Sequence, residues 1–84
     1  MHTAKPYNQC TPDEIARRTS PHLIQVLDNR AAGRVAWTAV HGRDQAALTD
    51  RTLVGADGTV TDMGRRVLSV IKITRAAAME AKYQ

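Results

Sequence analysis

Large apolar residues along this chain recur in short stretches, and several of these stretches have helical spacing. The first stretch able to anchor a hydrophobic core follows Ser20 and Pro21. Its apolar face consists of Leu23, Ile24, Val26 and Leu27. Ser20 and Pro21 suit the N-cap and the first position of a helix. We expect this helix to end near Gly33, because glycine adopts the left-handed conformation that closes many helices.

A shorter helix is predicted immediately before it, beginning at Pro12. Thr11 is the expected N-cap, and Glu14 stands three residues later, where a capping box needs a carboxylate. Ile15 is the only large apolar residue of this helix, so we expect it to pack as an accessory. Residues 1–10 have no periodic apolar pattern and are predicted to form a flexible arm.

The middle of the chain has a weaker pattern. Residues 34–40 fit either a short strand or a helical turn, because the alternation of apolar and polar positions is only partly regular. Trp37 lies in this segment, and we expect its side chain to be buried, since aromatic residues are scarce in the chain. Residues 42–51 are predicted to form a helix with Ala47 and Leu48 facing the core.

A tight hairpin is predicted after this helix. Two short segments that favour strands, Leu53-Val54 and Thr59-Val60, flank four residues that include Asp57-Gly58. An Asp-Gly pair between such segments is typical of a hairpin turn, because glycine accepts positive φ without strain.

A long final helix is predicted to begin at Thr61 and Asp62, with Met63, Val67, Val70, Ile71 and Thr74 on one face. Gly64 lies in its first turn, where glycine costs on the order of 1 kcal/mol relative to alanine. We therefore expect another part of the backbone to approach Gly64 closely, either the hairpin or the helix around Leu27.

Two stretches near the hairpin resemble a recurrent signature of winged helix-turn-helix domains. They are residues 47–54, with the sequence ALTDRTLV, and residues 57–68, with the sequence DGTVTDMGRRVL. In such families the recognition helix ends in a phrase like Leu-x-x-Arg-Gly-Leu-Val, and a Leu-Thr-x-x-Gly-Arg-x-x-Leu phrase opens the helix after the wing. The resemblance covers roughly residues 20–74. Thr52 departs from it, because the family usually has glycine there.

The resemblance implies a mostly α fold with a small β-hairpin, an α+β winged helix-turn-helix. The expected organisation is a flexible arm over residues 1–10, the winged domain over 11–74 and a C-terminal helix extension over 75–84. Small DNA-binding proteins of this type occur in actinobacterial genomes and their bacteriophages. The resemblance therefore implies a regulator of transcription that binds double-stranded DNA.

Composition excludes several other functions. The chain has 84 residues, enough for one domain, and 12 Lys and Arg against 8 Asp and Glu give a net charge of +4. With one cysteine, Cys10, and three histidines without metal-site spacing, we expect no metal and no cofactor. No motif indicates an enzyme. With no apolar run of the ~20 residues that a membrane helix needs and no apolar leader, a cytoplasmic protein is expected.

Six residues are candidates for DNA binding on this fold. Arg43, Gln45 and Arg51 belong to the presumed recognition helix, where Arg can bind guanine and Gln adenine. Arg34, Arg65 and Arg66 are expected to contact phosphates. The alternative for all six is an ordinary solvated surface, because acidic residues alternate with the arginines.

A second hypothesis is a protein–protein interaction module, of the kind that phage proteins use to modulate a host protein in the host cytoplasm. The modest net charge and the absence of Lys and Arg from the turn at 55–58 favour it. The last helix is longer than the domain needs. Its end is therefore a candidate homodimer or partner surface, with Ile73, Ala77 and Met79 as the interface, or else a solvated tail.

Overall fold

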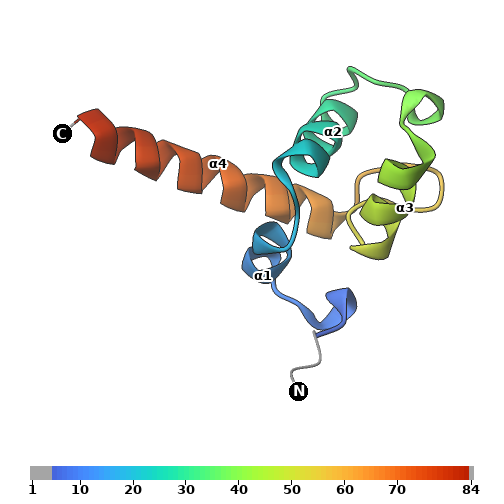
Figure 1. The fold of residues 1–84 in the computed structure, drawn as a ribbon, viewed down its shortest axis with the longest axis horizontal. Helices are drawn as coiled ribbons and strands as arrows, with labels where there is room; N and C mark the ends of the chain where they lie inside the picture. The colour runs from blue at the N-terminus through green and yellow to red at the C-terminus, as the bar shows by residue number, and fades with distance from the viewer. Residues whose placement is uncertain (1–4, 84) are drawn as a thin grey trace.

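The computed structural model describes the backbone of residues 5–83 and the side chains of residues 5–74. The elements in order are η1 (Tyr7–Gln9), α1 (Pro12–Arg17), α2 (Pro21–Ala31), η2 (Trp37–Ala39), α3 (Gly42–Asp50) and α4 (Asp62–Tyr83). The first part of α4 packs against α1 and α2, and α3 packs against α2. Figure 1 shows the C-terminal half of α4 extending away from the other helices.

The helix boundaries follow the capping signals in the sequence. The backbone N–H of Glu14 donates to Thr11 Oγ1 (3.3 Å) and the backbone N–H of Thr11 donates to Glu14 Oε1 (3.1 Å), which confirms the predicted capping box of α1. Ser20 Oγ accepts a hydrogen bond from the N–H of Leu23 at the start of α2. Gly33 has a φ of +73°, and the N–H groups of Gly33 and the next residue bond back to α2, as in a Schellman motif.

The predicted β-hairpin is wrong, and with it the winged α+β fold. The described residues contain one isolated antiparallel bridge, Val54 to Val60, and no sheet. The N–H of Leu53 bonds to the carbonyl oxygen of Leu48 in α3, and its carbonyl oxygen accepts from the N–H of Thr61 just before α4. The first bond ties the segment to the end of α3, and the second flanks the single bridge directly before α4 begins at Asp62. Only a tight turn therefore remains where a wing was expected.

That tight turn packs on Trp37. Gly58 has a φ of +82°, and a Cβ at this position would collide with the indole ring. Residues 34–40, which fitted a strand or a helical turn, contain the single 3-10 turn η2. Trp37 is half-buried, less than expected, and packs against the edge of the core.

Every α-helix and the segment after α3 contribute to one hydrophobic core. Its fully buried side chains are Ile15, Leu27, Leu48, Leu53 and Val67. Burying an aliphatic side chain of this size stabilises the fold by about 1.5–3 kcal/mol. The core thus includes Ile15 of α1, the helix expected to be an accessory.

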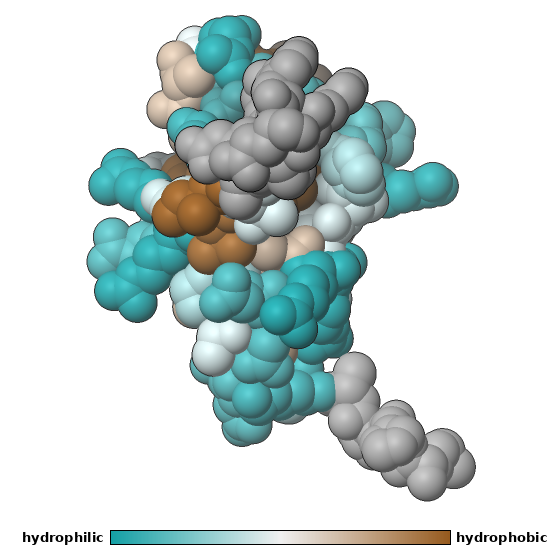
Figure 2. Space-filling view, turned by 90° about the vertical axis from the view of Figure 1, so that its left-hand side faces the viewer, coloured by the Kyte–Doolittle hydropathy of each residue, from teal (hydrophilic) through white to brown (hydrophobic). Residues whose placement is uncertain are grey.

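The outside of the molecule is largely polar. Figure 2 views it from the side toward which α4 points, and a group of hydrophobic atoms is exposed there among hydrophilic ones. In the described part of the chain, no helix combines the length and the apolar character needed to cross a membrane.

Candidate nucleic-acid interface

The structure distributes the six candidate DNA-binding residues over α3, α4 and the connection after α2. Arg34 lies between α2 and η2, Arg43 and Gln45 lie on α3, and Arg51 is the C-cap of α3. Arg65 and Arg66 lie near the start of α4. Their hydrogen bonds divide them into two used inside the protein and four exposed.

Gln45 and Arg51 are used inside the protein. Gln45 is half-buried, and its Nε2 donates to the carbonyl oxygen of Trp37 at 2.8 Å. Arg51 donates from Nε and Nη2 to the carbonyl oxygen of Arg18 at 3.4 and 3.3 Å, and from Nη1 to that of Ala47 at 3.2 Å. Because these donors are occupied, we assign both side chains to the fold and not to base recognition.

Arg51 also helps to hold the N-terminal segment, which was expected to be a flexible arm. The ring of Tyr7 stacks against two guanidinium groups, with centroid distances of 4.1 Å to Arg18 and 5.0 Å to Arg51. Cys10 is only 6% exposed and belongs to the core. Residues 5–10 are therefore part of the fold, and His2 lies outside the described residues.

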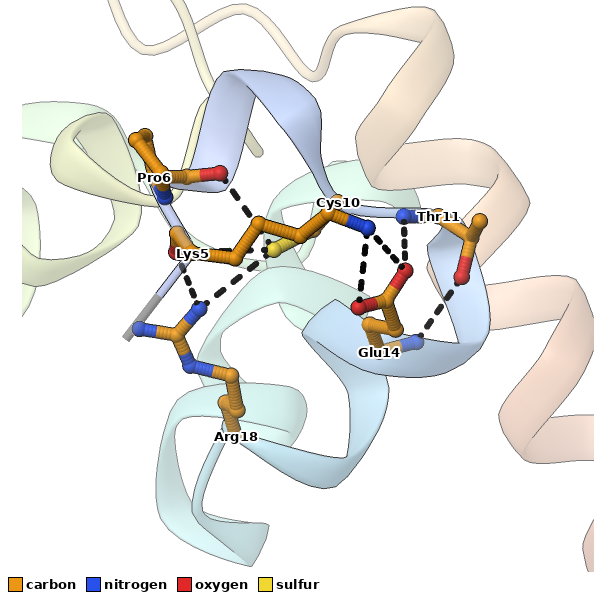
Figure 3. Close-up of polar contacts among 6 residues, drawn as sticks. All are labelled: Lys5, Pro6, Cys10, Thr11, Glu14 and Arg18. Carbon is orange, nitrogen blue, oxygen red and sulfur yellow. Dashed lines mark hydrogen bonds and ion pairs between the residues drawn. The ribbon is translucent and has the colours of Figure 1, made fainter. Parts of the chain in front are cut away.

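Figure 3 shows the polar contacts that fix this segment on α1. Arg18 Nη1 donates to the carbonyl oxygen of Lys5 at 2.6 Å and to Cys10 Sγ at 3.3 Å. Lys5 Nζ lies 3.2 Å from Glu14 Oε1. The backbone N–H of Thr11 and the ammonium of Lys5 lower the pKa of Glu14 below its ordinary value. Sequence reasoning missed these contacts, because an aperiodic segment carries no local signal of what it packs against.

Arg34 and Arg43 are exposed at opposite ends of the connection between α2 and α3. Arg34 Nη2 lies 2.9 Å from Asp28 Oδ2, a surface ion pair of the kind that contributes about 0–1 kcal/mol and that a phosphate can replace. The Arg43 side chain has no polar partner among residues 5–74. The nearby acid Asp44 pairs with His22 at 2.8 Å, while Asp50 at the end of α3 is exposed.

The densest group of free cations lies on the exposed face of α4. Arg65, Arg66 and Lys72 are exposed and have no polar partner within the described side chains. Arg65 and Lys72 are seven residues apart, about 10 Å along the helix and nearly in line, whereas Arg66 lies about 100° around the helix from Arg65. We call these three residues the α4 cationic row. Lys72 was not among the six candidates from the sequence, although its spacing of seven residues from Arg65 could have placed it in the site.

The turn after α3 opposes phosphate binding. Asp57 is exposed at its tip, and the N–H of Thr59 donates to Asp57 Oδ1 at 3.0 Å. This hydrogen bond lowers the pKa of Asp57, so the tip stays negatively charged at neutral pH. With Asp50 also exposed, α3 and the turn after it carry two exposed carboxylates beside Arg43, whereas the described side chains of α4 include one, Asp62, beside three exposed cations. The α4 cationic row is therefore the better surface for an anionic partner.

Within residues 5–74, no three His, Cys, Asp or Glu side chains come together as metal ligands would. No protein-family model, no curated protein and no solved structure matches this chain. Any functional assignment therefore depends on the surface described above.

Proposed function

We propose that the protein binds double-stranded DNA through its phosphates, as a small helical regulator of transcription. The α4 cationic row, three exposed cations on one helix without partners among the described residues, supports this proposal. Arg43 and Arg34 add two exposed guanidinium groups, the latter in a weak ion pair. Phosphate contacts of this kind provide affinity and orientation without reading sequence.

Base recognition has a smaller part in this proposal than the sequence alone suggested. Of the three residues expected to read bases, only Arg43 has free donors on the surface of α3. The other exposed side chains of α3 are the methyl group of Ala46, the hydroxyl group of Thr49 and the carboxylate of Asp50. We therefore expect weak discrimination between DNA sequences.

The salt dependence of DNA binding tests this proposal. Fluorescence anisotropy of a labelled random-sequence duplex should give a Kd of ~10⁻⁴–10⁻⁶ M near physiological salt. A plot of log K against log salt should have a slope of about −0.9 for each phosphate contacted, hence about −2.7 or steeper if the whole α4 cationic row takes part.

Arg65→Gln should weaken binding about five-fold near physiological salt and flatten the slope by about 0.9. Lys5→Gln is the matched control, because it removes the same charge from the N-terminal segment, where Lys5 pairs with Glu14 and belongs to none of the elements that carry the candidate DNA-binding residues. An equal loss in both variants would show a general charge effect and contradict the assigned surface. The absence of binding even at low salt would contradict DNA binding itself and favour the interaction-module hypothesis.

A further inference from the structure

An apolar groove lies between α1, the start of α2 and α4, and none of the residues of the DNA proposal lines it. Its volume is about 440 Å³, and its lining combines two threonines and two charged residues with five apolar residues, Ala16, Pro21, Ile24, Val70 and Ile71. A hollow whose lining is mainly apolar suits aliphatic side chains better than phosphates. Nothing in the described part of the chain fills it.

A protruding hydrophobic side chain stands next to this groove. Ile73 is 69% exposed, and it is the one large hydrophobic residue of the described range that is exposed to solvent. It lies one helical turn from Val70, which lines the groove. Figure 2, which looks at the molecule from the side toward which α4 points, shows exposed hydrophobic atoms on this side. The same surface thus carries both a protrusion and a hollow.

The rim of the groove carries one charge of each sign. Asp13 and Arg17 lie on α1 at the edge of the groove, and neither has an ion-pair partner among residues 5–74. A two-fold axis can therefore place Asp13 of each copy opposite the partner's Arg17. This arrangement lets two chains with a net charge of +4 each approach without opposing like charges at the contact.

We infer that two copies of the chain associate through this face, with Ile73 of each copy inserted into the groove of the other. A two-fold interface uses the same patch on both subunits, so that patch must be complementary to itself. The protruding Ile73, the adjacent groove and the opposite charges of Asp13 and Arg17 meet this requirement.

The course of α4 agrees with this arrangement. Residues 75–83 continue the helix beyond α1 and α2. Helices in proteins gain most of their stability from packing. A second copy on this face supplies a neighbour for that part of the helix. Ile73 was one of three residues expected at a partner interface; the other two, Ala77 and Met79, lie outside the described side chains.

The oligomeric state of the full-length chain tests the inference. Sedimentation velocity over a hundred-fold range of protein concentration should show conversion from monomer to dimer. Ile73→Asp should weaken the dimer by about a hundred-fold or more, because it removes the apolar contact and introduces a charge into the groove.

A second variant guards against effects on folding. Pro21→Glu places a carboxylate at the groove, while glutamate in the first turn of α2 suits the helix dipole, so the variant should fold and still lose the dimer. Thr49→Asp is the control, since Thr49 is exposed on α3 outside the groove. A chain that stays monomeric at every concentration overturns the inference. A dimer that survives Ile73→Asp, or one that Thr49→Asp also abolishes, overturns it as well.

Discussion

Thr52 holds a backbone conformation that its side chain disfavours. Its φ is +62°, in the left-handed region, where β-branched residues are rarely found. Two hydrogen bonds hold it there: its N–H donates to the carbonyl oxygen of Thr49 at 3.0 Å, and its carbonyl oxygen accepts from Thr61 Oγ1 at 2.6 Å. The residue therefore links the end of α3 to the start of α4 at the cost of local strain.

We predict that Thr52→Gly stabilises the protein by about 1 kcal/mol, because glycine adopts positive φ without strain. For a domain of this size, that gain raises Tm by roughly 4–8 °C. Thr52→Ala is the control, since it keeps a Cβ and therefore should gain less. Thermal unfolding followed by circular dichroism measures both. A Thr52→Gly variant that melts below the native chain would contradict the assigned strain.

A second residue-scale prediction concerns pH and Glu14. The pKa of Glu14 is lowered from an ordinary value of 4.5, first by the backbone N–H of Thr11 and then by the ammonium of Lys5. Its contribution to folding stability is therefore complete above about pH 4.5 and is lost as the pH falls through the lowered pKa of the folded state.

Chemical denaturation between pH 7 and pH 3 should therefore show a loss of stability at the acid end, and Glu14→Gln should reduce that loss. A titration followed by NMR gives the pKa of Glu14 directly. An unshifted pKa in the folded protein would show that the capping box and Lys5 do not hold the carboxylate.

At the scale of elements, Gly64 determines how closely α4 approaches the segment after α3. A Cβ at this position would collide with the carbonyl oxygen of Leu53 and crowd the side chain of Val60. This confirms the expectation that another backbone lies against the first turn of the last helix. The same carbonyl oxygen accepts from the N–H of Thr61, so it has little freedom to move away.

Gly64→Ala should therefore destabilise the protein by roughly 1–3 kcal/mol through overpacking, although alanine is the better helix former. Ser69→Ala is the matched control in the same helix, because Ser69 is exposed and the change should be neutral or stabilising by up to about 0.5 kcal/mol. Urea denaturation compares the two. Equal or greater stability of the Gly64→Ala variant would exclude a close backbone contact.

Internal arginines join these elements where a hairpin was expected to do so. Arg30 Nη2 donates to the carbonyl oxygen of Gly58 at 2.8 Å and its Nη1 to that of Val35 at 2.8 Å, which ties α2 to the turn and to the connection before η2. Arg51 joins α3 to the end of α1 by donating to the carbonyl oxygen of Arg18, and Arg18 joins α1 to the N-terminal segment by donating to that of Lys5. The arginine content of the chain thus serves the fold as well as the surface.

At the scale of the whole molecule, the two proposals depend on different side chains and have different measurements, although Arg66 and Ile73 are seven residues apart and lie on the same side of α4. DNA binding depends on the α4 cationic row and is tested by salt dependence, whereas self-association depends on the groove and Ile73 and is tested by mass. An experiment can therefore contradict DNA binding without contradicting self-association, and the reverse. If both hold, one dimer presents two cationic rows, and the salt dependence per complex becomes steeper.

The sequence by itself determined the helices, because their signals are local. The capping box of Thr11 and Glu14, the closing Gly33 and the apolar spacing of α2 and α4 act over a few residues and survive in the structure. The close approach at Gly64 was also predictable, since glycine in the first turn of a helix has a cost that packing must offset.

Only the tertiary structure decided which polar side chains are available to a partner. The sequence presents Arg51, Gln45 and Arg65 equally as candidate polar contacts. In the structure, Gln45 and Arg51 donate to the backbone carbonyl oxygens of Trp37 and Arg18, whereas the Arg65 side chain has no polar partner among the described side chains. The pairing after α3 stays at the single bridge of Val54 and Val60, because the N–H of Leu53 is bonded to Leu48 in α3 and α4 begins at Asp62. Local preference cannot specify such contacts, since they depend on residues brought together by packing of the helices.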